Sequence, residues 1–364
     1  MKKLIFSFCF LTGILITACG DSGTVTDPNN GSNGSDNLFY LAENGITIKC
    51  PSAAVGDTGT VNGKDYIKRE AHQITHYNAE ETCTSDIKDM SNVFENNSGI
   101  SEGISSWDVS KVSNMSAMFE DADNFNEDLN NWNVSNVTDM SNMFANAESF
   151  NGNISNWNVG NVTDMNDMFF SASSFNRNIN SWNVSNVTNM SGMFVQADQF
   201  NGNISSWDVS NVKDMSGMFS NNDTFNGDLS GWDVSNVTNM SAMFDDADNF
   251  NGDISNWDVS KVEEMVDMFG GATSFNRNLS SWNVSNVTNM DYMFHDAPAF
   301  NKDIGDWNVS NVNSMVWMFA EASTFNQDIS GWCVENINIE PENFSTDSPL
   351  QDSNKPVWGT CPSN

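Results

Sequence analysis

The chain has 364 residues, of which 38% are hydrophobic, and its 14 basic residues against 48 acidic ones leave a formal charge of −34. This length suffices for a buried core, but so acidic a surface would repel duplex DNA, RNA and anionic lipid headgroups, which excludes nucleic-acid binding. A pI near 4.1 favours solubility, cationic counterions and basic partner surfaces.

The N-terminus has the features of an export signal. Two lysines precede an apolar stretch from Leu4 to Ile16 that is too short to span a bilayer. The predicted signal, residues 1–18, ends in a sequence that resembles the lipobox of bacterial lipoproteins, in which the following cysteine, here Cys19, is acylated. An ordinary secretory signal that happens to contain a cysteine is the alternative. We expect an exported protein, anchored to the membrane at the bacterial cell surface through a lipid such as palmitate.

The signal is followed by two segments without repeats. Residues 19–38 are rich in Gly, Ser, Asn and Asp and lack large apolar groups, which predicts a flexible tether. In residues 39–83, the alternating Ile46 and Ile48 with glycine-containing turns predict a small β element, and residues 66–81 are predicted to be helical. We expect residues 39–83 to be an N-terminal flanking or capping module.

Residues 84–334 are dominated by a 25-residue repeat. A fixed period predicts one supersecondary unit per repeat, stacked into a solenoid, because no single unit can bury its own apolar positions. Residues 87–94 are a degraded copy, and residues 335–364 are expected to form a C-terminal cap. The step is kept without a break by ten of the twelve tryptophans: Trp107, Trp132, Trp157, Trp182, Trp207, Trp232, Trp257, Trp282, Trp307 and Trp332.

Residues 129–153 state the repeat unit almost completely. The L-x-x-W-x-V spacing at its start matches the L-x-x-L-x-L of leucine-rich repeats and predicts a strand over residues 129–134. Apolar residues at steps of three and four then predict a helix that begins near Thr138 and extends to Ala147. The positions expected to point inward are Leu129, Trp132, Val134, Val137, Met140, Met143, Phe144, Ala147 and Phe150.

The predicted fold class is therefore an α/β repeat. We expect a leucine-rich-repeat-like solenoid of about ten 25-residue coils, each with a short strand and a short helix, and a cap at either end. Two columns run along the repeats, one of phenylalanines (Phe125, Phe150) and one of asparagines (Asn126, Asn151). Both are predicted to be internal ladders in which Asn satisfies backbone groups; a row of ligand-binding Asn is the alternative.

The cysteines outside the signal and the anchor allow three disulfide pairings. We prefer Cys50 with Cys83 and Cys333 with Cys361, so that each bond fastens a flanking segment over one end of the repeats. The other two pairings would join opposite ends of a rod about 45 to 50 Å long. Export to an oxidising compartment permits these bonds.

The repeats resemble those of the BspA-like leucine-rich repeat surface proteins, a group that includes the 25-residue repeats of mycoplasma surface lipoproteins. The resemblance covers residues 87–334 and is carried by units such as FNGNISSWDVSNVKDMSGMF, residues 200–219. The flank at residues 44–66 is similar to the segment that often precedes such repeats. The resemblance implies a surface-exposed solenoid, often adhesive or partner-binding, with no catalytic residues to transfer.

Few residues suggest catalysis or metal binding. His72 and His76 have the i, i+4 spacing of a zincin helix, but Gln73 replaces the glutamate base that this chemistry needs, which leaves at most an adventitious zinc site. His295 occupies a variable surface position and is given no role. The acidic clusters at residues 121–123 and 245–248 gather oxygen atoms suited to calcium, although their spacing matches no calcium-binding loop that we recognise. We expect no cofactor, with calcium as the alternative.

The candidate binding surface consists mainly of Asp and Asn residues that follow each tryptophan. Such small polar side chains suit weak multivalent contacts with an extracellular protein or a glycan. Tyr292 and Trp317 share another column; they either bind a ligand or pack beneath the cap. The function expected is adhesion or binding by a surface lipoprotein without enzymatic activity, and the alternative is a structural spacer or stalk. The first set of candidates is Asp108, Asn133, Asn158, Asn183, Asp208, Asp233, Asp258, Asn283 and Asn308.

Overall fold

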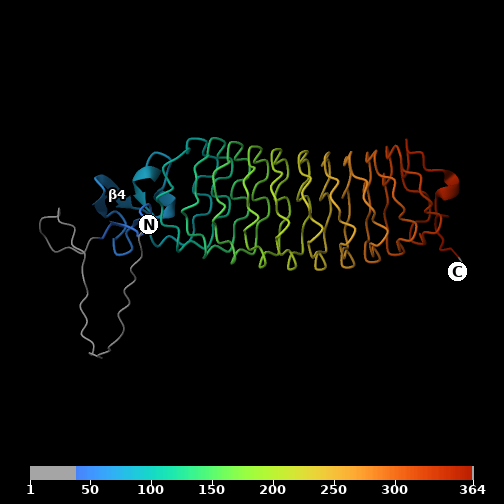
Figure 1. The fold of residues 1–364 in the computed structure, drawn as a ribbon, viewed down its shortest axis with the longest axis horizontal. Coiled ribbons are helices and arrows are strands. Elements are labelled where there is room, and N and C mark those ends of the chain that lie inside the picture. The colour runs from blue at the N-terminus through green and yellow to red at the C-terminus, as the bar shows by residue number, and fades with distance from the viewer. Residues whose placement is uncertain (1–37, 363–364) are drawn as a thin grey trace, which may run out of the picture. The chain divides into compact units, whose positions relative to one another are not determined.

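The computed structural model describes residues 38–362 (Figure 1). Figure 1 shows the repeats as successive loops that lie side by side, with the short strands gathered at the N-terminal side. Among the described residues, the regular elements lie before residue 84, apart from one turn of 3-10 helix in the C-terminal segment, η3 (Asp352–Asn354).

The N-terminal module contains two small sheets. In the first, β1 (Tyr40–Leu41) pairs antiparallel with β2 (Ile48–Lys49). In the second, β3 (Thr58–Val61) pairs antiparallel with β4 (Lys64–Lys68), and β4 pairs parallel with β5 (Thr82–Cys83). The predicted small β element is confirmed.

The module has a core of its own. The turn between β3 and β4 is Asn62-Gly63, and both residues have a positive φ, as a tight two-residue hairpin requires. The predicted disulfide between Cys50 and Cys83 is confirmed. The buried residues of this core are Phe39, Ile48, Cys50, Ala53, Val61, Tyr66 and Cys83.

The helix predicted over residues 66–81 is wrong. The segment begins with the end of β4 and continues with two turns of 3-10 helix, η1 (Ala71–Gln73) and η2 (Ala79–Glu81). Between them, the Asn78 side chain accepts a hydrogen bond from the Thr75 N–H at 2.9 Å and donates one to the Gln73 carbonyl at 3.0 Å. Local bonds of this kind offer the backbone an alternative to the helical pattern.

The predicted core of the repeats is confirmed. All nine inward positions of residues 129–153 are buried, and none is more than 3% exposed. The rings stack from repeat to repeat: Trp132 and Trp157 have centroids 6.4 Å apart, and Phe144 and Phe169 have centroids 5.7 Å apart. Burial of large aromatic side chains in one continuous cluster is the main source of stability here.

The predicted α/β class is wrong for the described repeats, because neither the strand over 129–134 nor the helix from Thr138 is present. Asn142 and Asn146 both have a φ of 56°, the left-handed conformation, which interrupts a right-handed helix. The same two columns carry a positive φ in successive repeats. The molecule is a repeat protein built from turns.

Backbone hydrogen bonds between repeats replace the predicted helix. The Met140 N–H donates to the Asp164 carbonyl at 3.1 Å, and the Phe144 N–H donates to the Met168 carbonyl at 3.0 Å. One parallel bridge also joins each repeat to the next, in a series that runs from Asp89 to Ser314. Buried backbone groups need partners, so the N–H groups that a helix would pair internally hold neighbouring repeats together instead.

Two side-chain columns add further bonds between repeats. The Trp157 Nε1–H donates to the Leu129 carbonyl at 2.9 Å, and the other tryptophans of the column repeat this contact. The Asn151 N–H donates to the Asn126 Oδ1 at 2.8 Å. The predicted role of the Asn column is confirmed, although these side chains lie at the partly exposed surface rather than inside.

The C-terminal segment continues the pattern of the repeats. The N–H groups of Phe319 and Glu321 each donate at 2.8 Å, to the carbonyls of Phe344 and Thr346. The predicted disulfide between Cys333 and Cys361 is confirmed. This segment therefore supplies one more hydrogen-bonded row after the last repeat.

Several expectations lie outside the described residues. They are the signal at residues 1–18, acylation at Cys19, and nearly all of the tether at residues 19–38. Within the described part, no helix has the length and apolar character needed to cross a membrane.

Candidate functional site

The Asp and Asn residues that follow the tryptophans form an exposed column, with Asp108 as the exception. One oxygen of each is used locally. The Asn133 Oδ1 accepts a hydrogen bond from the Ser135 N–H at 3.2 Å, and the Asp258 Oδ1 accepts one from the Ser260 N–H at 3.0 Å. These side chains stabilise the turn after each tryptophan, and their remaining polar atoms face solvent.

Local hydrogen bonds favour the ionised form of two acidic residues of this column, Asp233 and Asp258. Hydrogen bonds from the Ser235 side chain and backbone lower the pKa of Asp233, and the same bonds from Ser260 lower the pKa of Asp258. A shallow hollow of about 350 Å³ lies beside Asp258 and Asn283. The column therefore offers small, charged or polar groups on a nearly flat face.

The prediction that Asp108 belongs to this exposed surface is wrong, because Asp108 is only 7% exposed. The Ser85 Oγ–H donates to its Oδ2 at 2.7 Å, and the Lys49 Nζ lies 3.7 Å from its Oδ1. Burial opposes ionisation, but hydrogen bonds from Ser110 and Ser85 and the charge of Lys49 outweigh it and lower the pKa of Asp108. Asp108 joins the N-terminal module to the first repeat.

Tyr292 and Trp317 form an aromatic pair at the surface. Their rings stack with centroids 6.2 Å apart and planes 15° from parallel, and the His295 ring meets both edge-on, at 5.9 and 5.5 Å. Tyr292 is 37% exposed. The Trp317 N–H donates a hydrogen bond to the Glu342 carbonyl in the C-terminal segment. Trp317 is thus hydrogen-bonded to the cap through its backbone.

Three carboxylates, those of Asp245, Asp246 and Asp267, lie close together in the two repeats that precede Tyr292. Burial is the main cause that raises the pKa of Asp245 to about 7, and the negative charges of Asp267 and Asp246 add to it. Burial likewise raises the pKa of Asp267 to about 6, against the opposing influence of His295. His295, which sequence reasoning did not select, thus packs edge-on against both rings and acts electrostatically on Asp267.

His72 and His76 are not held on one helical face, because no helix forms there. The His72 Nδ1 lies 3.4 Å from a carboxylate oxygen of Glu70. The His76 ring lies 3.8 Å from the ring of Tyr77, centroid to centroid. The spacing that suggested an adventitious zinc site therefore loses its geometric basis.

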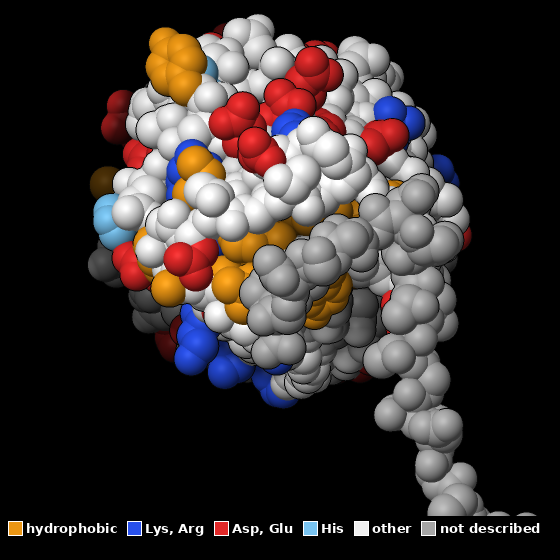
Figure 2. Space-filling model, turned by 90° about the vertical axis from the view of Figure 1, so that its left-hand side faces the viewer, with side chains coloured by type: hydrophobic (Ala, Val, Ile, Leu, Met, Phe, Trp, Pro, Cys, Tyr) orange, Lys and Arg blue, Asp and Glu red, His pale blue; other side chains and the backbone are white. Residues whose placement is uncertain are grey.

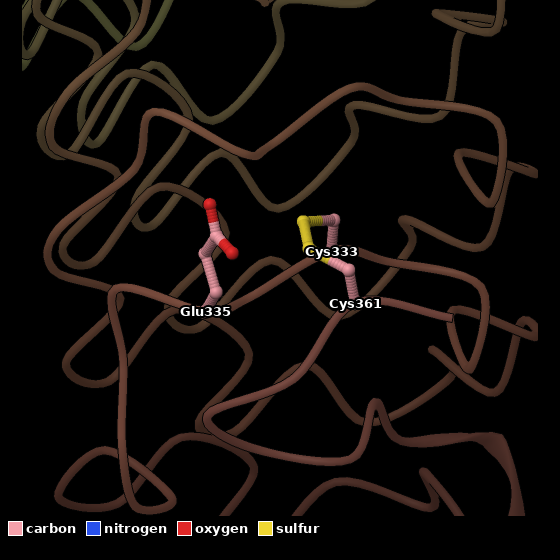
Figure 3. A group of neighbouring side chains, drawn as sticks. All are labelled: Cys333, Glu335 and Cys361. Atoms are coloured by element: carbon pink, nitrogen blue, oxygen red, sulfur yellow. A yellow bond between two sulfur atoms is a disulfide. The ribbon is translucent and has the colours of Figure 1, made fainter. Parts of the chain in front are cut away.

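Among the described residues, the one group of three potential metal ligands with converging atoms is Cys333, Glu335 and Cys361. Figure 3 shows the Glu335 carboxylate beside the disulfide of the two cysteines. Disulfide sulfurs are not the thiolates that bind metals, so this group is not a metal centre. The acidic clusters proposed for calcium are not among such groups.

A hollow of about 770 Å³ lies where the N-terminal module meets the first repeat. Its lining mixes charges of both signs, such as Lys88 and Asp89, with apolar side chains such as Ile74 and Val93. Figure 2 views this end and shows hydrophobic side chains at the surface among acidic and basic ones.

Sequence reasoning missed Asp267, His295 and their neighbours Gly270 and Gly271 as one surface. The sequence does contain the information needed to find this surface, because the same surface position recurs every 25 residues. Asp245, Gly270 and His295 occupy that position in three successive repeats. Each residue looks unremarkable alone. Side-by-side comparison of the columns would have placed the acids next to the rings.

The fold and its surface define the class of protein, which is an acidic protein of stacked 25-residue repeats that presents polar columns to solvent. The family model described as "Mycoplasma protein of unknown function, DUF285" matches residues 66–182, 173–270 and 249–356. These ranges cover most of the chain, which therefore belongs to this family. No curated protein matches the chain.

Proposed function

We propose that this protein is an exported surface lipoprotein, acylated on Cys19, that uses its repeats for adhesion or for binding an extracellular protein or glycan. One observation carries the proposal: turn residues at the same place in successive repeats, from Asn133 to Asn308, are exposed in a continuous column. Many similar contact points in a row suit weak multivalent binding, in which avidity exceeds the affinity of each contact.

We further propose that the repeats form a solenoid related to those of the BspA-like leucine-rich repeat proteins. The L-x-x-W-x-V spacing of the unit and the rows of backbone hydrogen bonds between units support this relation. The relation is one of spacing and stacking, since the described repeats lack the strand of a leucine-rich repeat.

We assign no catalytic role. Catalysis needs an acid, a base and a nucleophile or electrophile that converge in one cleft, whereas the column presents the same kind of small polar group in each repeat. The competing hypothesis is a spacer or stalk that binds nothing.

Binding is tested by probing arrays of glycans and matrix proteins with the full chain, in millimolar calcium and again in chelator. We expect binding that weakens in a variant with Asp208→Asn, Asp233→Asn and Asp258→Asn, because these changes remove charge and use a residue already present in the column. Absence of binding to every ligand on the arrays would favour the hypothesis of a structural spacer or stalk. Dependence of the signal on calcium would assign the ion a role.

The anchor is tested separately. Cells that express the full chain are labelled with a palmitate analogue, and Cys19→Ala is the matched control. We expect label on the wild type alone, and equal label on both proteins would refute acylation at Cys19.

A further inference from the structure

Four successive repeats bring together six side chains that differ from the regular columns. We name them the aromatic–acid patch: Asp245, Asp246, Asp267, Tyr292, His295 and Trp317. The charges of Asp245 and Asp246 act on Asp267, and Asp267 in turn interacts with His295. The His295 ring contacts both Tyr292 and Trp317. The patch is therefore contiguous.

The aromatic side chains of the patch occupy unfavourable backbone positions. Tyr292 and Trp317 have φ values of 60° and 59°, in a column that elsewhere holds residues such as Asn142 and Gly192. A bulky residue in the left-handed region is a genuine outlier, so the backbone is strained at both positions. Neither ring belongs to the main core cluster, so packing of that core does not explain them.

Two glycines make room for the carboxylates. A Cβ on Gly270 would lie 1.9 Å from the Asp267 Oδ1 and 3.3 Å from the Asp245 Oδ1, and a Cβ on Gly271 would lie 2.0 Å from the Asp246 Oδ1. The missing side chains thus leave the space into which the three carboxylates fold. Among the described residues, none of the three forms a salt bridge with a lysine or arginine.

We infer that the aromatic–acid patch binds an arginine or lysine side chain of a basic partner protein, with its cationic group against the exposed Tyr292 ring and the partly exposed Trp317 ring and paired with the Asp267 carboxylate. Aromatic faces and carboxylates attract organic cations together. The inference rests on the proposed binding function and names its partner class. The overall charge of −34 favours encounter with a basic surface.

Two other ligand classes fit the patch less well. The carboxylates do not belong to a described group whose ligand atoms converge on one metal ion. Tyr292 and Trp317 stack on each other rather than side by side in one plane, so they do not form the extended platform that a neutral glycan would cover. Burial is the main cause of the raised pKa values of Asp245 and Asp267, and the charge of Asp246 adds to both; a bound cation would favour the ionised form of each carboxyl.

The test is calorimetric titration of the full chain with a nine-residue peptide that carries three arginines among Gly and Ser. A lysine analogue, a glutamate analogue and maltohexaose are run in parallel. We expect Trp317→Asn and Asp267→Asn each to weaken binding of the arginine peptide about tenfold. Both variants place asparagine where Asn142 already occupies the same column, and unchanged melting temperatures would show that they fold.

Glu148→Gln is the matched control, because it removes one negative charge from an exposed side chain that belongs neither to the candidate column nor to the patch. We expect less than a twofold effect, and an effect as large as that of Asp267→Asn would overturn the inference in favour of general charge attraction. Affinity for the arginine peptide should also fall as pH drops below 7, because Asp245 and Asp267, whose pKa values are raised to about 7 and about 6, become protonated and lose their negative charge. Asp246 is the third acid of this cluster, and a carboxylate oxygen of Glu321 lies 3.9 Å from the His295 Nε2.

The outcomes separate this inference from the proposed function. Array binding that persists without peptide binding would refute the patch and keep the binding function. Peptide binding with silent arrays would keep the patch and refute adhesion to the probed ligands. Binding of maltohexaose in place of the arginine peptide would overturn the assignment to a cation.

Discussion

The tryptophan ladder makes a quantitative prediction for Trp207→Phe. Trp207 is 3% exposed, its Nε1–H donates to the Ile179 carbonyl at 3.0 Å, and it stacks on both neighbours in the ladder. Phenylalanine loses that hydrogen bond, worth about 1 kcal/mol, and leaves a gap in the core that costs about 1 to 2 kcal/mol more. The Ile179 carbonyl keeps its bond from the Trp182 N–H, so the total should be about 2 to 3 kcal/mol.

Urea unfolding followed by circular dichroism measures this loss, and Trp358→Phe is the control. Trp358 is only partly buried, contacts Phe344 edge-on, and belongs to the C-terminal segment rather than to the ladder. We expect it to cost less than about 1 kcal/mol. Equal losses from the two variants would show that the ladder bond and the depth of burial contribute nothing specific.

Three further predictions concern stability. Asn222→Ala should stabilise the fold by about 1 kcal/mol in urea unfolding, since the buried Asn222 Nδ2 has no partner among the described groups. Gly217→Ala should destabilise the fold by about 1 kcal/mol, and Ala242→Gly should stabilise it by about 1 kcal/mol, because both positions have a positive φ that glycine tolerates better than alanine. A methyl group at Gly217 meets no clash, so backbone strain alone is tested there. Melting temperatures equal to that of the wild type would refute this reasoning. The folded-state pKa of Asp245 is raised, so the stability that it contributes is present at low pH and is lost between its ordinary 3.8 and about 7. Asp245→Asn should therefore match the wild type at pH 4 and exceed its melting temperature at pH 8.

The core of the repeats was predictable because apolar burial depends on spacing alone. Leu129, Trp132 and Val134 point inward at the predicted positions although no strand forms. The two disulfides followed from the same period, since Cys83 and Cys333 occupy equivalent positions at opposite ends of the repeats. Hydrophobic pattern and chain connectivity thus specify which residues meet, whichever backbone conformation joins them.

The secondary structure of the repeats was not predictable from apolar spacing. Steps of three and four also arise in consecutive turns, where Met143 N–H donates to the Met140 carbonyl and Ala147 N–H donates to the Phe144 carbonyl. The informative signal lay in other columns. Residues such as Asn142 and Gly192 tolerate a left-handed backbone, and their recurrence every 25 residues argues against a helix.

The burial of Asp108 was unpredictable for a different reason. Its position in the repeat is equivalent to that of the exposed Asn133, so the period assigns both residues to the surface. Lys49 and Ser85, which cover Asp108, come from segments outside the regular repeats. A repeat pattern carries no information about contacts with a non-repeating neighbour.

Because a regular repeat offers nearly the same groups in every unit, we expect selectivity between partners to come from the residues that depart from the repeat pattern. A column of Asp and Asn presents nearly the same groups every 25 residues, so it distinguishes partners by charge and length rather than by shape. Tyr292 and Trp317 break that uniformity at a cost of about 1 to 3 kcal/mol each. The stacked core of the neighbouring repeats offsets this cost, because one or two strained positions are a small fraction of the apolar burial in the array. A regular array therefore provides the stability that permits a strained, chemically distinct patch at one place on its surface.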